Sequence, residues 1–323
     1  GPVAEGIVAA VRGAEANPGL LSMQDLAAYR VIERPAVCVE YRAHDVCGMG
    51  PPSSGGLTVG QVLGMLGGYD LGALGAENPE SWRLIGDASR LAFADRGRFI
   101  ADSDHVPMPT EGLIDPAYLA ERSKLLAGDD SLPEVSAGQP GWSHAALWGQ
   151  DTALELPSTT HISIVDADGN ALSMTTTIEN GFGARVMANG FLLNNELTDF
   201  SFETHDENGW PIANALAPGK RPRSSMAPTI VLRDGRPVFA LGLPIGLTLV
   251  AETGMFTGAN VLMGWFGAEP LAHVRSIDIR DAADLSRIAI IRRPVVILLA
   301  VRFGDVLLID QRVAHPKGVP DVR

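Results

Sequence analysis

The sequence has little positive charge, few cysteines and no long apolar run, and each shortage excludes a class of protein. Its 25 lysines and arginines are outnumbered by 38 acidic residues, so the net charge is −13 at pH 7. A general nucleic-acid binder needs a cationic surface, so that class is excluded. No run approaches the roughly 18 apolar residues of a membrane-spanning helix, and the longest, residues 294–301, lies between Arg293 and Arg302. The hydrophobic content of 46% is still that of a globular protein with a core.

Only two cysteines occur, Cys38 and Cys47, and their spacing fits no zinc pattern. A two-residue turn at Arg42 and Ala43 would fold residues 37–49 into a hairpin and set the cysteines opposite each other. Two small buried residues are the favoured interpretation, because cysteine readily fills apolar sites. A disulfide formed in an oxidising compartment is the alternative. The sequence shows no metal or nucleotide motif, so no cofactor is expected.

The chain opens with Gly-Pro-Val-Ala-Glu, without methionine or signal peptide, and continues directly into a helical pattern. Such a start is typical of a fragment or a processed piece, so the missing signal says nothing about the compartment. With 323 residues, one large or two modest domains are expected.

The first half of the sequence predicts mainly helices, and the second half predicts strands. Helices are expected over 1–12, after the capping-box pattern that begins at Ser22, over 57–66 and over 80–99. The candidates for the buried side of the last helix are Trp82, Ile85, Leu91 and Phe93. Residues 127–157 are rich in Gly, Pro, Ser, Asp and Ala and lack periodicity, which indicates a linker. Strands follow, including a hairpin over 229–243 that turns at Asp234-Gly235, so layered α+β packing is expected.

Two clusters of threonine flank a tight turn within residues 159–177. The apolar residues alternate as in strands, and Ala167-Asp168-Gly169 fits a type I turn closed by a left-handed glycine. This register pairs Asp166 with Asn170 and, counting outward, sets Thr159 opposite Thr177. Two facing hydroxyls can hydrogen-bond, although the pair contributes under ~1 kcal/mol as structure. Packing of β-favouring residues is therefore the alternative to a functional pair.

A threonine hydroxyl is a poor nucleophile at neutral pH unless a base lies within hydrogen-bond reach. One solution uses the threonine's own α-amine, which is freed when the chain is cut before the residue and has a pKa of about 7.7–8.0. A linker that ends at Pro157-Ser158 and a strand that opens at Thr159 suit such a cut.

At this point the sequence resembles the γ-glutamyltransferase family, also called glutathione hydrolases, within the N-terminal-nucleophile hydrolases. The matching segments are TTHISIVDADGNALSMTTTIENGFGARV, GFLLNNELTDFS, KRPRSSMAPTIV, YRAHDVCGMGPPSSGG and LAFADRGRFIADSD. They cover roughly residues 1–246. The resemblance implies an α+β fold, the four-layer αββα sandwich, in partial form. It implies that residues 1–158 are the C-terminal part of a large-subunit region and that 159–323 are a small-subunit region, of which 247–323 are divergent or frameshifted.

The family implies a precursor that cleaves itself at the Ser158–Thr159 bond. Thr159 would then attack γ-glutamyl amides such as glutathione and pass the glutamyl group from an acyl-enzyme to water, amino acids or peptides. Thr177 matches the supporting threonine, and Thr160 is the rival nucleophile. The implied partners are γ-glutamyl small molecules, acceptors and the two subunits of one precursor. The implied compartment is periplasmic or extracellular.

A γ-glutamyl group carries an α-ammonium and an α-carboxylate. In the family the ammonium is held by groups that match Glu179, Glu196 and Asp199, and the first two are more often amides. Ser224 and Ser225 match the pair that binds the carboxylate. Solvated loop charges and turn serines are the alternatives. His161 is interpreted as structural, and the PPSSGG loop is interpreted as scaffold at the subunit contact.

The sequence departs from the family at two places. The family's arginine that clamps the substrate carboxylate lies upstream of the first residue of this chain. The family's Pro-Gly-Gly oxyanion hole matches LGLPIG, so its donors map to Ile245 and Gly246, and isoleucine does not easily adopt positive φ. One oxyanion donor is typically worth ~10²–10³ in rate. An acylase acting on glutaryl-type side chains and a non-catalytic remnant are the alternative functions.

Overall fold

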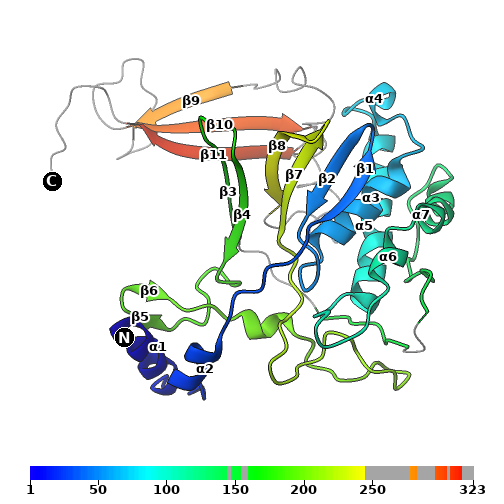
Figure 1. The fold of residues 1–323 in the computed structure, drawn as a ribbon. Helices are drawn as coiled ribbons and strands as arrows, with labels where there is room; N and C mark the ends of the chain where they lie inside the picture. The colour runs from blue at the N-terminus through cyan, green and yellow to red at the C-terminus, as the bar shows by residue number, and fades with distance from the viewer. Residues whose placement is uncertain (144–146, 154–158, 244–275, 282–294, 304–305, 315–323) are drawn as a thin grey trace. The chain divides into compact units, whose positions relative to one another are not determined.

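The computed structural model describes residues 1–143, 147–153, 159–243, 276–281, 295–303 and 306–314. The chain divides into two compact units, residues 1–74 with 78–261 and residues 75–77 with 262–323. The helices of the first unit are α1 (Pro2–Arg12), α2 (Met23–Ala28), α3 (Gly55–Leu66), α4 (Leu71–Leu74), α5 (Pro79–Phe99), α6 (Thr110–Leu113), α7 (Pro116–Ser123), η1 (Lys124–Leu126) and η2 (Glu196–Asp199) (Figure 1). Its strands are β1 (Val37–Tyr41), β2 (His44–Gly48), β3 (Thr159–Val165), β4 (Ala171–Thr177), β5 (Met187–Ala188), β6 (Phe191–Leu192), β7 (Ala227–Arg233) and β8 (Arg236–Leu243).

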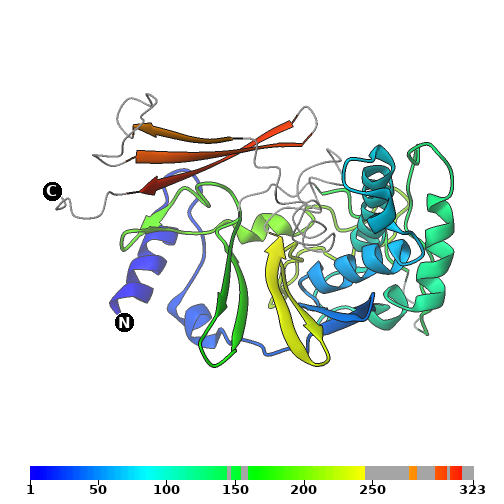
Figure 2. The same ribbon diagram turned by 90° about the horizontal axis from the view of Figure 1, so that it is seen from above.

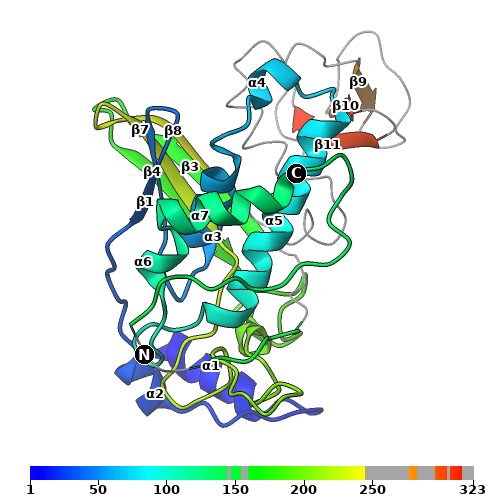
Figure 3. The ribbon, with the colours of Figure 1, turned by 90° about the vertical axis from the view of Figure 1, so that its right-hand side faces the viewer.

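A four-stranded antiparallel sheet in the order β1-β2-β7-β8 forms the centre of this unit. Helix α3 packs on β1, β2 and β7, and α5 and α7 pack on α3, so helices cover one face of the sheet (Figure 3). Leu57 of α3 is buried in a core with Phe99, Ile100 and Leu113. The first turn of helix α3 lies in direct contact with the strands, which is possible because Gly55 has no side chain. A Cβ there would lie 2.6 Å from the Cα of Ala227.

The β3–β4 hairpin packs on the other side of the sheet, against β7 and β8. Figure 2 shows this order, with the helices, the β7–β8 hairpin and then the β3–β4 hairpin. Ser173 joins the layers, because its hydroxyl donates to the Leu241 carbonyl at 2.7 Å and accepts from the Thr229 N–H at 3.0 Å. Gly242 is needed where it stands, because an added Cβ would lie 2.1 Å from the imidazole of His161. The predicted layered α+β packing is confirmed.

Most predicted elements have their expected positions. The capping box at Ser22, the helices near 1–12, 57–66 and 80–99 and the hairpin turn at Asp234-Gly235 are all present. The predicted buried side of α5 is partly wrong, because Trp82 and Phe93 are only half-buried. The buried apolar stripe of α5 follows helical spacing instead, and the two aromatic residues flank it. Its members are Leu84, Ile85, Ala88, Leu91 and Ala92.

The predicted linker contains no helix or strand beyond η1 within its described residues, 127–143 and 147–153, apart from an isolated bridge at Gly149. Two buried carboxylates of α5 hold it. The Leu132 N–H donates to Asp87 at 3.1 Å, and the Gly138 N–H donates to Asp95 at 2.7 Å. The segment is therefore irregular in conformation but anchored along α5.

Cys38 and Cys47 lie directly opposite each other on β1 and β2 and form a disulfide. The favoured interpretation of two buried thiols is wrong, because Cys38 is exposed. Side chains alternate along a strand, and β1 directs Val39 and Tyr41 towards the helices. Cys38 therefore points to the opposite face, where it reaches Cys47.

Replacing both cysteines by alanine is expected to lower the free energy of unfolding by about 2–3 kcal/mol. The crosslink spans a sequence separation of 9, and closing a loop of that size removes about this much entropy from the unfolded chain. Urea unfolding of the double variant measures the loss, and the wild type in reducing agent should match it. An unfolding midpoint that is the same with and without reductant would contradict the prediction.

The second unit contains β9 (Ser276–Asp281), β10 (Val295–Phe303) and β11 (Val306–Ala314), in the antiparallel order β11-β10-β9. Residue 295 pairs with 281 on one side and with 314 on the other. The apolar, β-branched run within this part of the sequence forms the central strand, as such residues favour a pleated surface. Among the described helices, none is both long and apolar enough to cross a membrane.

Candidate active site

The β3–β4 hairpin, which carries the two clusters of threonine, has the predicted register. Thr159 pairs with Thr177, and the turn closes through a hydrogen bond from the Asp166 N–H to the Asn170 carbonyl at 3.0 Å. Gly169 has φ +86°, which supplies the left-handed residue that the turn requires. The Thr159 hydroxyl donates to Thr177 Oγ1 at 3.3 Å. The two hydroxyls that the sequence placed together are therefore within hydrogen-bond distance.

Thr160 is the neighbour of Thr159 but lies on the other face of β3. It pairs with Thr176 and is exposed. Because side chains alternate along a strand, Thr160 is directed away from Thr177. The geometry therefore favours Thr159 over its rival as the hydroxyl of this site.

Glu179 follows the end of β4 and turns the chain towards the interior. Its backbone N–H donates to Thr177 Oγ1 at 2.9 Å, and its φ is +68°, a left-handed conformation that is uncommon for a residue other than glycine. The side chain is buried and accepts hydrogen bonds from Asn195 Nδ2 and, at 3.4 Å, from the Thr198 hydroxyl. Backbone strain of this kind is frequent at functional sites.

Glu196 and Asp199 on η2 bring two further carboxylates to this place. Burial raises the pKa of Glu196, the charge of Glu179 raises it further, and a hydrogen bond with Asp199 acts in the opposite direction. Glu196 Oε1 is buried and has no hydrogen-bond partner within the described part of the chain. Three clustered carboxylates with one orphaned oxygen form a site that a positively charged donor would stabilise.

Ser224 and Ser225 lie on the segment before β7 and are held by the PPSSGG loop. The Ser224 carbonyl accepts from the N–H of Ser54 at 2.8 Å and from its hydroxyl at 2.9 Å. Arg96 of α5 is buried and donates to Ser225 Oγ at 2.6 Å and to Ser54 Oγ at 2.8 Å. The PPSSGG loop therefore positions the serine pair, in agreement with its interpretation as scaffold.

His161 sits within a group of hydroxyls between the two sheet layers. Its Nδ1 lies 2.8 Å from Thr175 Oγ1, and its Nε2 lies 3.1 Å from Ser163 Oγ. Burial lowers the pKa of His161, which favours the neutral ring. These contacts support the structural interpretation of this residue.

Three predicted site residues lie outside the described residues, namely Ser158, Ile245 and Gly246. Two further residues of the site were not predicted from the sequence. Asn195 donates a hydrogen bond to Glu179, and Arg96 donates one to Ser225. Asn195 stands within the LNNELTDFS motif, which is a signal that could have identified it. Arg96 gave only the weaker signal of an arginine inside a helix with an apolar face.

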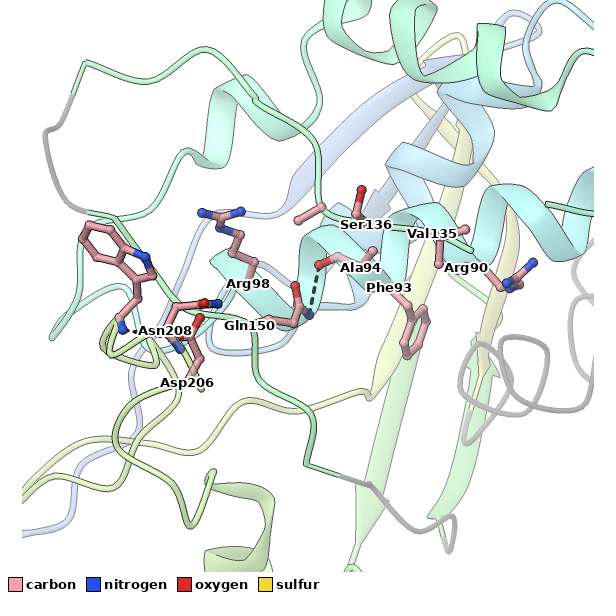
Figure 4. Close-up of a pocket in the computed structure, with 11 residues that line it drawn as sticks. Arg90, Phe93, Ala94, Arg98, Val135, Ser136, Gln150, Asp206 and Asn208 are labelled. Carbon is pink, nitrogen blue, oxygen red and sulfur yellow. Dashed lines mark hydrogen bonds between the residues drawn. The ribbon is translucent and has the colours of Figure 1, made fainter. Parts of the chain in front are cut away.

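A pocket of about 640 Å³ is lined by a different set of residues (Figure 4). They are Arg90, Phe93, Ala94, Arg98, Val135, Ser136, Ala137, Gln150, Asp206, Asn208 and Trp210. Its arginines already bind main-chain carbonyls: Arg90 donates to Leu132 at 2.5 Å, and Arg98 donates to Trp148 at 2.9 Å. None of the predicted site residues lines this pocket, so we place the candidate active site at the threonine pair.

Comparison with known proteins shows the family to which the chain is similar. The family model described as Gamma-glutamyltranspeptidase matches residues 1–276, which extends beyond Gly246. The glutathione hydrolase proenzyme of Escherichia coli is 36% identical over 240 residues, which are 72% of this chain and 40% of that protein. An Acylase ACY 1 proenzyme from Pseudomonas is 39% identical over 236 residues, which are 72% of this chain and 39% of that protein. The chain thus spans about two-fifths of the length of these relatives.

Among solved structures, the cephalosporin acylase from Bacillus halodurans superposes with a TM-score of 0.63 at 20% identity. The match covers 98% of this chain and 59% of that one. At this identity the likeness shows a shared fold.

Proposed function

Because the chain belongs to the gamma-glutamyltranspeptidase family, we propose that it carries the nucleophile and part of the substrate site of a self-cleaving γ-glutamyl hydrolase and transferase. The observation that carries the proposal is the pair of hydroxyls of Thr159 and Thr177, 3.3 Å apart. Thr159 is also the first residue of β3, directly after the predicted cleavage bond.

Self-cleavage would use the Thr159 hydroxyl against the preceding peptide bond. Oγ1 forms an ester bond with the Ser158 carbonyl carbon while the C–N bond breaks, and the hydroxyl proton goes to the departing amine. Water then hydrolyses the ester and leaves Thr159 with a free α-amine. That amine has a pKa near working pH and can take the hydroxyl proton in later turnovers. Thr177 supports both steps, because its Oγ1 accepts a hydrogen bond from the Thr159 hydroxyl and so orients that hydroxyl.

The charged and polar groups of the site would bind the oppositely charged groups of the substrate. The cluster of Glu179, Glu196 and Asp199 suits the α-ammonium of a γ-glutamyl group, because its burial strengthens attraction to a cation. Ser224 and Ser225 would donate to the α-carboxylate. We infer glutathione and related γ-glutamyl amides as donors and amino acids or peptides as acceptors. The disulfide supports a periplasmic or extracellular location, since such bonds persist in oxidising compartments.

Intact mass and N-terminal sequencing of the purified chain test this proposal. Two pieces are expected, and the smaller should start at Thr159. A single uncut chain of 34.1 kDa after prolonged incubation would overturn the proposal, because the nucleophile would then lack its working geometry.

An acylase that accepts glutaryl-type side chains is the second candidate, and the similarity to Acylase ACY 1 favours it. The two functions differ in their need for the α-ammonium. Comparison of γ-glutamyl-p-nitroanilide with glutaryl-p-nitroanilide separates them, because the carboxylate cluster should prefer the first. Equal or better turnover of the glutaryl compound would establish the acylase instead.

Glu196 should contribute to the pH dependence of γ-glutamyl donor binding. Its pKa is raised by burial, so at lower pH the side chain is neutral and holds the α-ammonium weakly. Protonation of the Thr159 α-amine alone lowers kcat/KM about tenfold per pH unit, and below the pKa of Glu196 the fall for the γ-glutamyl donor should become steeper. Glu196→Gln should keep the limb of the α-amine and lose the added steepness, because the amide does not titrate. A pH–rate profile of both forms checks this, and an acid limb of the same steepness in Glu196→Gln would refute it.

A further inference from the structure

Asn214 is a buried amide, 1% exposed, that touches both halves of the candidate substrate site. Its Nδ2 donates to the Asp199 carbonyl at 2.7 Å, and its Oδ1 accepts from the Arg223 N–H at 2.9 Å. Its own carbonyl accepts from the Ser201 N–H at 3.1 Å. One side chain thus joins the end of η2 to the residue that directly precedes Ser224.

The two segments that Asn214 joins have different tasks in the proposed function. Asp199 belongs to the carboxylate cluster for the α-ammonium, and Arg223 leads into the serine pair for the α-carboxylate. In an α-amino acid these two groups are attached to one carbon, so their separation is fixed. The protein must match this separation, although the two segments lie apart in the sequence.

An amide is suited to this connection, because it offers a donor at one end and an acceptor at the other. A carboxylate keeps the acceptor and the shape but loses the donor. Asn214 Nδ2 also lies 3.4 Å from Asp151 Oδ2, which is itself buried. An aspartate at 214 would therefore place an acceptor against two other acceptors on that side.

We propose that Asn214 is a positioning residue that sets the distance between the ammonium-binding carboxylates and the carboxylate-binding serines. The inference rests on the proposed function of this site, although its test does not depend on turnover. Asn214 touches no reacting atom, and its effect passes through Asp199 and Arg223.

The test is isothermal titration of L-glutamate into the purified full chain and its variants, with glutarate as the analogue that lacks the ammonium. Asn214→Asp should weaken glutamate binding about tenfold, as expected when one buried hydrogen bond is replaced by repulsion. Glutarate affinity should change little, because that ligand engages only the serine side. A merely structural role would weaken both ligands alike and leave the ratio of their affinities unchanged, and that result would overturn the inference.

Two further variants complete the design. Asn208→Asp makes the same chemical change at an exposed position in the same region, and it should bind both ligands as the wild type does. Asn214→Ala removes both connections without adding a charge, and it should also lower the preference for glutamate over glutarate. If neither variant at 214 unfolds cooperatively, Asn214 is a folding residue and the inference is wrong.

Failure of the proposed function and failure of the positioning inference would give different results. If the wild-type chain binds glutamate but neither cleaves itself nor turns over a γ-glutamyl donor, the proposed function is contradicted. The positioning inference is then still decided by comparing how the variants bind glutamate and glutarate. Wild-type chain that does not prefer glutamate to glutarate would overturn the positioning inference.

Discussion

Thr159→Ala is expected to leave the chain as one uncut polypeptide with no measurable γ-glutamyl turnover. The substitution removes the hydroxyl that lies 3.3 Å from Thr177 Oγ1 and opens β3. No other group in the described part of the site lies in the same place, since Thr160 is on the opposite face of the strand. Loss of the nucleophile should cost roughly 10⁴-fold or more in rate. Intact mass and hydrolysis of γ-glutamyl-p-nitroanilide measure the two effects.

Matched controls make this result specific. Thr160→Ala changes the adjacent residue of the same motif and should cleave normally, because its side chain is exposed. Thr159→Ser keeps a hydroxyl and should cleave, more slowly. Thr177→Val keeps the shape of the partner but removes the acceptor, so it should slow cleavage without abolishing it. Cleavage of Thr159→Ala at the same bond would exclude Thr159 as the nucleophile.

The geometry of the threonine pair could be predicted because its cause is local. The turn between Asp166 and Asn170 fixes the register, and a fixed register determines every facing pair along the two strands. Residues from 159 to 177 contain all of this information. The same reasoning correctly placed Cys38 opposite Cys47, because that hairpin is likewise fixed by a short local turn, at Arg42 and Ala43.

The support of the site could not be predicted in the same way, because its contacts join distant parts of the sequence. Arg96 reaches Ser225 across 129 positions, and no periodicity or motif indicates such a partner. The exposure of Cys38 was also misjudged, since burial depends on which face of β1 receives the helices. The left-handed conformation of Glu179 is a further case, because nothing in the local sequence favours it over an extended one.

Asp151→Ala is expected to lower the free energy of unfolding by about 3–5 kcal/mol, the cost of removing one partner of a buried ion pair. Asp151 Oδ2 accepts from Arg223 Nη2 at 3.0 Å, and both side chains are almost completely buried, at 1% and 2% exposure. Without the carboxylate, the guanidinium keeps neutral acceptors such as the Arg96 carbonyl at 3.3 Å. These carbonyls do not compensate its charge. Urea unfolding at constant m-value measures the loss.

Two comparisons decide whether buried charge is the cause of that loss. Glu121 and Lys124 form an ion pair at 2.5 Å with side chains about 70% exposed, so Glu121→Ala should change stability by no more than about 1 kcal/mol. The double variant Asp151→Leu with Arg223→Met removes both buried charges and fills similar volumes, so it should recover much of the stability lost in Asp151→Ala. If the double variant is as unstable as the single one, the loss comes from packing and hydrogen bonds around Asn214 rather than from the loss of the buried ion pair. In the expected case, the buried pair fixes the position of the segment that carries Ser224 and Ser225 more than it adds net stability.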